Sequence, residues 1–268
     1  MTVKKWGALV AAGALAAALT LFGCSSGGEN SDSSSGSASD AGYTLINDGK
    51  LTVAASLDFP PFENLNGDVP EGFAVDLMNA LAAELDLECE YLPSTKFDTI
   101  IPLIQTGGKA DVGVSSFTVN DERLDQVDFT DTYCDVNQSI TVLKDSGVTE
   151  VSQLEGKKIG AQSGTTGYEW ASENVKDAQV VAFDEMTAVF AALQSGQIDA
   201  VAVDQPVANY YVKNAYTDCE VIVTIPTGEQ YAMAVSKDNP ELTAALNKAL
   251  QAVRDNGTYA DLEAKWLQ

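Results

Sequence analysis

The sequence contains no histidine among its 268 residues, and basic residues are scarce, with 15 Lys and Arg against 39 Asp and Glu. Without imidazole the chain cannot build a Ser-His-Asp or Cys-His nucleophile, or a zinc site based on histidine. The formal net charge of −24 argues against nucleic-acid binding, which depends on basic side chains that contact phosphates. Any chemistry must therefore use carboxylates, amines, hydroxyls or thiols.

Cysteine is also rare, with four in the chain. One of them, Cys24, follows an apolar leader, which leaves Cys89, Cys134 and Cys219. An exported protein can form disulfides, but three thiols leave at least one unpaired, and the sequence alone does not say which. We expect all three to be buried as small hydrophobic side chains. No cluster of residues predicts a metal site or a cofactor.

Residues 1–23 have the pattern of an export signal, with two lysines ahead of an apolar run from Trp6 to Gly23. The run is nearly long enough to span a bilayer, so a retained transmembrane anchor is the alternative. Leu21-Phe22-Gly23-Cys24 resembles the lipobox of bacterial lipoproteins, although Phe22 is bulkier than usual there. The resemblance implies lipidation of Cys24 by acyl chains such as palmitate, and a protein anchored to the cell membrane and facing outside.

Residues 24–42 are almost wholly small and polar. Such a segment cannot bury enough apolar surface to offset its ordering entropy, so we expect a flexible tether. Its length favours a cell with a single membrane. The large negative charge would not adhere to anionic lipid, which makes a covalent lipid the plausible means of attachment.

From Tyr43 onward, β-rich runs alternate with helical patterns. The spacing predicts strands at 51–56, 88–92 and 110–115 and helices at 73–87 and 97–105. The pattern then restarts, with strands at 158–161, 179–183 and 200–203 and helices from about 163, at 186–193 and at 205–213. Each βαβαβ unit indicates a mostly parallel sheet covered by helices on both faces.

Two longer β-rich runs, 135–143 and 229–236, lie between and after these units, and residues 239–268 are helical. The two runs could be edge strands of one large sheet. Alternatively, they cross between two lobes and leave a cleft. Because ligands collect at the carboxyl ends of strands in open α/β sheets, two facing lobes would share one site.

Several side chains at these strand ends together complement an α-amino acid zwitterion. The planar guanidinium of Arg123 suits a carboxylate, and the helix start at 165–167 also favours an anion. Asp204 ends an apolar strand and is placed to accept from an ammonium group. Further hydrogen bonds and apolar walls come from Ser115, Thr118, Phe59 and Phe97.

Each of these residues also has a simpler interpretation. Arg123 lies among acidic neighbours, so a solvated ion pair on a short helix would explain it. Asp204 precedes a helix and could serve as its N-cap. Phe59 and Phe97 could be ordinary core residues.

The segment from Leu51 to the C-terminus, taken whole, resembles the bacterial extracellular solute-binding proteins, family 3, of polar amino-acid ABC importers. The motifs that carry this resemblance, in chain order, are Phe59-Pro-Pro-Phe-Glu63, Gly72-Phe-Ala-Val-Asp-Leu77, Phe97-Asp-Thr-Ile-Ile-Pro-Leu103, Asp111-Val-Gly-Val-Ser-Ser116, Thr118-Val-Asn-Asp-Glu-Arg123, Val127-Asp-Phe-Thr-Asp131, Gly160-Ala-Gln-Ser-Gly-Thr165, Ile198-Asp-Ala-Val-Ala-Val-Asp204 and Asp255-Asn-Gly-Thr-Tyr259.

The resemblance implies an α/β protein with the two-lobed, periplasmic-binding-protein-like fold of type II. Each lobe is a mostly parallel sheet flanked by helices, and two crossing strands form a hinge. Lobe 1 would comprise 43–137 and 231–268, and lobe 2 would comprise 138–230.

The family's pattern also implies a set of ligand-binding residues. Arg123 would hold the ligand carboxylate and Asp204 the ammonium group. Many relatives carry an acidic residue at the place of Ser56, which weakens the case for lysine, arginine or glutamine as ligand. The full implied set is Ser56, Phe59, Phe97, Ser115, Ser116, Thr118, Arg123, Gln162, Thr165, Thr166 and Asp204.

The implied function is the substrate-binding component of an ABC importer. As a monomer without cofactor or catalytic activity, it would close around a polar amino acid and deliver it to the membrane permease. One alternative is a ligand-binding sensor subunit with a separate membrane partner. Another is an enzyme similar to cyclohexadienyl dehydratase, which needs a cleft carboxylate as general acid, such as Asp58, Glu63 or Asp135.

Overall fold

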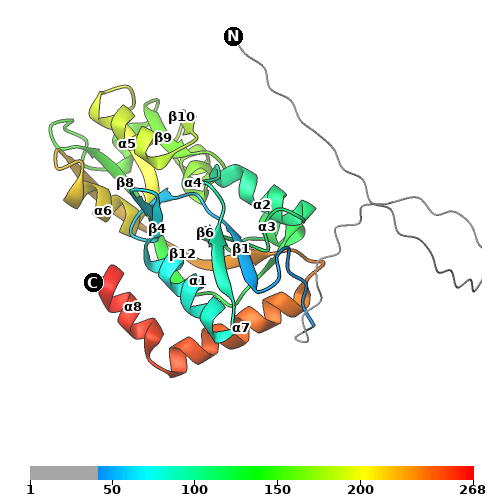
Figure 1. Ribbon diagram of the computed structural model, residues 1–268. Coiled ribbons are helices and arrows are strands. Elements are labelled where there is room, and N and C mark those ends of the chain that lie inside the picture. Colours follow the sequence, from blue (N-terminus) through cyan, green and yellow to red (C-terminus); the bar gives the residue numbers. More distant parts are fainter. Residues whose placement is uncertain (1–41) are drawn as a thin grey trace, which may run out of the picture. The chain divides into compact units, whose positions relative to one another are not determined.

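The computed structural model describes residues 42–268, which fall within one compact unit, Gly36–Gln268 (Figure 1). The predicted leader, the lipidation site Cys24 and nearly all of the predicted tether lie outside the described residues. None of the helices within residues 42–268 is long and apolar enough to cross a membrane.

The main sheet is mixed and has nine strands in the described chain. They are β1 (Lys50–Ala54), β5 (Glu88–Tyr91), β6 (Val112–Thr118), β7 (Asp128–Phe129), β8 (Cys134–Leu143), β9 (Lys158–Gln162), β10 (Gln179–Phe183), β11 (Ala200–Asp204) and β12 (Cys219–Val235). Their order is β10-β9-β11-β8-β12-β6-β1-β5, and β7 pairs with β12. Both predicted parallel units are present, as β5-β1-β6 and as β10-β9-β11.

Each parallel unit carries its own helices, which defines two lobes (Figure 1). The first lobe contains β1, β5 and β6 with α1 (Phe73–Glu84), α2 (Phe97–Thr106), α3 (Asp121–Gln126), α7 (Pro240–Asp255) and α8 (Thr258–Trp266). The second lobe contains β9, β10 and β11 with α4 (Thr166–Asn174), α5 (Met186–Gln194) and α6 (Gln205–Asn214).

Strands β8 and β12 lie in the middle of the sheet, where they pair antiparallel with each other. Strand β8 also pairs with β11 of the second lobe, and β12 with β6 of the first. They are therefore not edge strands, and of the two alternatives the sequence left open, the two-lobed fold is confirmed. Strand β12 begins at Cys219, well before the predicted run, and its register shifts between Ile225 and Glu229.

A small antiparallel sheet that the sequence did not predict lies beside the first lobe. It comprises β2 (Asp58–Phe59), β3 (Glu63–Asn66) and β4 (Val69–Glu71). Gly72 ends it with φ +129°, and a Cβ there would lie 2.2 Å from the Phe62 carbonyl oxygen. Only glycine fits this close approach, which turns the chain directly into α1.

The core of the first lobe shows why α1 forms where it does. Phe73, Leu77 and Leu81 recur at helical spacing, and all three are fully buried. Among the cysteines in the described chain, Cys219 is buried as predicted, whereas Cys89 and Cys134 are half-buried, and all three are free thiols. Burial raises the pKa of Cys89 and of Cys134 to about 12.

Candidate functional site

A small cavity lies where the two lobes meet. Both lobes contribute to its wall, and every lining residue belongs to the set predicted from the sequence. The first lobe supplies Phe59, Phe97, Ser115, Ser116, Thr118 and Arg123, and the second supplies Thr165, Thr166 and Asp204.

Arg123 is only 7% exposed, on a short helix whose N-cap, Asn120, accepts a hydrogen bond from the Arg123 backbone N–H at 2.9 Å. Its guanidinium donates to the carbonyl oxygens of Thr118 at 2.7 Å and of Gly164, in the second lobe, at 2.9 Å. It also lies 5.4 Å from the centre of the Phe97 ring. Burial lowers the pKa of Arg123, yet five N–H donors leave spare capacity for a carboxylate. The solvated ion pair is therefore the wrong interpretation of this residue.

Asp204 ends β11 and is 5% exposed. It occupies the N-cap position of α6, but its side chain makes no capping hydrogen bond. Instead its Oδ1 accepts from Gln138 Nε2, on β8, at 3.1 Å. Burial, followed by the nearby charge of Glu229, raises the pKa of Asp204 to about 7. The Asp204 carboxyl, which lines the cavity, therefore changes its charge near neutral pH.

The N-terminus of α4 supplies part of the cavity wall on the side of the second lobe. Thr165 caps the helix by accepting from the Tyr168 N–H at 3.3 Å, and it donates to the Gln162 carbonyl at 2.8 Å. A Cβ at Gly167 would lie 3.0 Å from both the Ala202 carbonyl and Gln138 Oε1. The missing side chain lets this helix start approach β8 and β11 closely.

Two serines within β6, Ser115 and Ser116, hydrogen-bond to groups behind the cavity. Ser115 Oγ accepts from the Ser56 N–H at 3.2 Å. Ser116 has φ +49° and donates to both oxygens of Glu63, at 3.1 and 2.9 Å. Glu63 is fully buried, and burial raises its pKa to about 8.

Ser56 and Gln162 are buried beside the cavity but do not line it. Gln162 Nε2 lies 3.4 Å from Ser56 Oγ, across the boundary between the lobes. Next to them, Asp58 accepts from Ser56 Oγ at 2.8 Å and from the Met186 N–H of the second lobe at 2.5 Å. Polar groups at this edge of the cavity thus join one lobe to the other.

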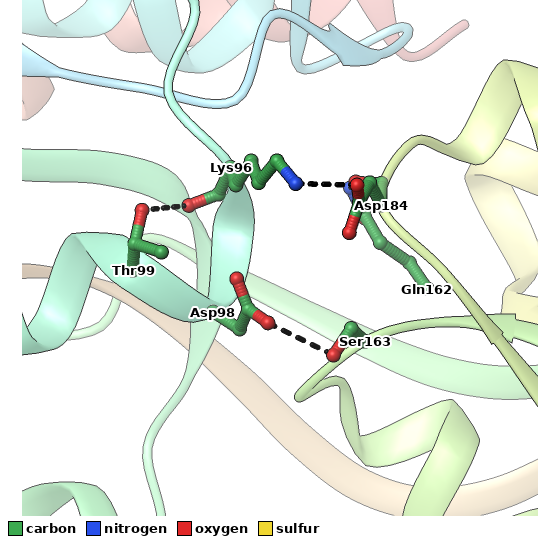
Figure 2. A network of polar contacts seen from close by, with 6 residues as sticks. All are labelled: Lys96, Asp98, Thr99, Gln162, Ser163 and Asp184. Atoms are coloured by element: carbon green, nitrogen blue, oxygen red, sulfur yellow. Dashed lines mark hydrogen bonds and ion pairs between the residues drawn. The ribbon is translucent and has the colours of Figure 1, made fainter.

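Figure 2 shows a second set of contacts across the boundary, farther toward solvent. Lys96, just before α2, forms an ion pair with Asp184, and Ser163 Oγ donates to Asp98 at 2.9 Å. Gln162 Nε2 also donates to the Asp184 carbonyl at 3.1 Å. Because Lys96 and Asp184 are exposed, we expect their ion pair to add little to the stability of the closed arrangement of the lobes.

A family model for the bacterial extracellular solute-binding proteins, family 3, matches residues 51–268. The chain belongs to this family. It is 33% identical to a "probable histidine-binding protein" of Neisseria gonorrhoeae, over 99% of this chain and 96% of that protein.

Among solved structures, an ancestral arginine-binding protein bound to arginine has a TM-score of 0.77 and 38% identity, over 82% of this chain and 99% of that one. Another has a TM-score of 0.75 and 36% identity, over 82% and 96% of the two chains. It is described as an ancestral amino-acid-binding protein and a precursor of cyclohexadienyl dehydratase. These relatives are named for binding, which supports a substrate-binding role outside the cell and not an enzymatic one.

The acids considered for an enzyme of this fold do not line the cavity in the described chain. The Asp58 carboxylate accepts a hydrogen bond from Met186 of the second lobe, and the buried Glu63 carboxyl accepts one from Ser116. Asp135 is exposed and accepts from Gln230 at 2.6 Å. None of the three is placed to protonate a molecule in the cavity.

Two polar side chains near the cavity were missed by the sequence analysis, Gln138 on β8 and Glu229 on β12. Both belong to the long crossing strands, which were predicted, but the periodicity gave no reason to single them out. Gln138 is 1% exposed, but β8 also carries Asp135, Asn137, Ser139 and Thr141, so the sequence held no distinct signal for it.

Proposed function

We propose that this protein captures a polar amino acid between its lobes and delivers it to an ABC permease. The observation that carries the proposal is the pair of buried side chains of opposite charge, Arg123 and Asp204, which line one cavity from different lobes. An amino acid presents a carboxylate and an ammonium group, so it can neutralise both. The eleven residues expected from the family's pattern are the proposed binding set.

Capture would be coupled to closure of the lobes. The cavity is enclosed by both lobes, so a ligand enters or leaves when they separate. Because the ligand contacts both lobes only when they are together, it stabilises the closed arrangement selectively. Strands β8 and β12 are the proposed hinge, and the proposed lobe boundaries are 43–137 with 231–268, and 138–230.

The proposed molecule is a monomer held at the outer face of the cell membrane by acyl chains on Cys24. Cells given a labelled fatty acid should then label the parent but not a Cys24→Ala variant, and equal labelling of the two would count against the anchor. Two relatives are named as ABC transporter binding proteins, for arginine and for glutamine, which supports an ABC permease as the receiving complex.

The ligand can be identified with a thermal-shift screen of the twenty amino acids with cystine and ornithine, since a tight ligand raises the unfolding midpoint by mass action. For the best ligand, Arg123→Ala should weaken binding by about 2–5 kcal/mol, because it leaves a buried carboxylate unpaired. Calorimetry in which Arg123→Ala binds like the parent would contradict the proposed role of this residue.

A further inference from the structure

Strand β12 carries a carboxylate, Glu229, that the proposed binding set does not include. Its Oε2 accepts from Thr118 Oγ1 at 2.9 Å, from Thr166 Oγ1 at 2.8 Å and from Gln138 Nε2 at 3.1 Å. Thr118 ends β6 in the first lobe, and Thr166 begins α4 in the second. One carboxylate oxygen therefore holds a hydroxyl group from each lobe.

Glu229 shares its amide donor with Asp204. Gln138 Nε2 lies 3.1 Å from Asp204 Oδ1 and also 3.1 Å from Glu229 Oε2. Only the NH₂ end of an amide can lie between two carboxylates without repulsion. Two acidic side chains thus converge on this end of the cavity, with one neutral donor between them.

The charges around Asp204 leave this end of the cavity negative. Burial raises the pKa of Asp204 first, and Glu229 on β12 raises it next. Tyr231 and Arg123 lower the pKa of Asp204, and Asp204 in turn raises the pKa of Glu63. A positive group on a ligand would relieve the repulsion between the carboxylates.

Glu229 also lies at the border between the inner cavity and a groove on the outside of the protein. Thr118 and Thr166 line the inner cavity, and together with Glu229 they line an outer groove of about 320 Å³. Glu229 is half-buried, whereas Asp204 is buried. Its carboxylate is therefore anchored by the cavity hydroxyls while part of the residue remains accessible to water.

We propose that Glu229 is a positioning and specificity-determining residue of the ligand site. It orients the two threonine hydroxyls and the Gln138 amide around Asp204, and it adds a second negative charge that favours ligands with a free ammonium group. This inference rests on the proposed amino-acid binding. It assigns part of the selectivity for the ligand's ammonium group to the crossing strand β12.

The test compares the parent with Glu229→Gln by titration calorimetry between pH 5.5 and 8.5. The probe is whichever of L-arginine, L-histidine or L-glutamine binds the parent most tightly. A hydrogen bond to a charged group suggests that Glu229→Gln weakens binding about ten- to a hundredfold at pH 8. The variant's loss of affinity on acidification should begin at a lower pH than the parent's, because Asp204 no longer has Glu229 as a charged neighbour.

Two further variants separate charge from structure. Glu229→Asp keeps the charge and should retain the parent's pH profile with weaker binding. Glu220→Gln changes an exposed acid on the same strand and should bind like the parent. The unfolding midpoint without ligand should be similar for all four proteins.

The inference is overturned if Glu229→Gln binds within twofold of the parent. It is also overturned if binding weakens uniformly with an unshifted pH profile, because that result indicates a purely structural role. Failure of the parent to bind any amino acid would overturn the proposed function itself, and this inference with it.

Discussion

Asp204 is a buried acidic residue, and its burial raises its pKa. Its pKa is about 7, so near neutral pH a proton and a ligand ammonium group compete for the same carboxyl. Below pH 7 the unliganded protein increasingly holds the proton. We expect Kd to rise about tenfold for each pH unit below 7, and to level off above pH 8.

Titration calorimetry across this pH range measures the effect. Asp204→Asn is the control, since it lacks the ionisable group and should bind weakly with little dependence on pH. A parent Kd that stays constant down to pH 5.5 would show that Asp204 does not bind the ammonium group in its ionised form.

Glu63 is a second buried carboxyl, with a pKa raised from 4.5 to about 8. The folded protein therefore binds this proton more tightly than the unfolded chain. Its contribution to the free energy of unfolding is greatest below pH 4.5 and is lost as the pH rises toward 8. We expect Glu63→Gln to reduce the decline in stability between pH 5 and pH 8, as measured by urea denaturation. A decline as steep as the parent's would contradict the raised pKa.

At the scale of elements, helix α5 lacks a cap of its own. Glu185 is at its N-cap position without a capping hydrogen bond, and the carboxylate of Asp58 arrives from the first lobe to accept from the Met186 N–H. A cap of this kind contributes about 0.5–2 kcal/mol. Because the cap forms only with the lobes together, Asp58→Ala should weaken ligand binding by about that amount.

Calorimetry with Asp68→Ala as a matched control tests this role of Asp58, since Asp68 is exposed in the turn between β3 and β4. The control should bind like the parent. Equal affinities for both variants would mean that the trans-lobe cap does not favour closure.

Most helices and strands could be predicted because their periodicity is set by burial on one face. Strand 179–183 and helix 186–193 match β10 and α5 almost residue for residue. The β2–β4 sheet was missed because its strands have two to four residues, too few for a pattern, although Gly67-Asp68 is a typical two-residue hairpin loop. The first part of β12 was missed because Pro226 and Gly228 interrupt it.

The residues of the candidate site that lie at or just after the ends of predicted strands could be predicted from the sequence. Nine of the eleven predicted residues line the cavity, whereas Ser56 and Gln162 lie beside it. Gln138 and Glu229 could not be found in this way. Which side chains of a crossing strand face the cavity depends on pairing with distant strands, and in β12 the register shifts just before Glu229.

At the scale of the whole molecule, the two lobes resemble each other in architecture but contribute different charges to the cavity. The first lobe supplies the cation Arg123, and the second supplies the acid Asp204. The crossing strands add Gln138 and Glu229 between them. A zwitterion is the simplest molecule that satisfies both lobes, so binding and closure should be one coupled equilibrium.

This coupling is tested most directly by titrating the protein with its best amino-acid ligand and with the N-acetyl derivative of the same ligand. Acetylation removes the ammonium charge and keeps the carboxylate and side chain. The account predicts that the N-acetyl form binds at least a hundredfold more weakly, because a buried Asp204 is left without its partner. Equal affinity of the two forms would contradict the claim that the lobes hold opposite ends of a zwitterion.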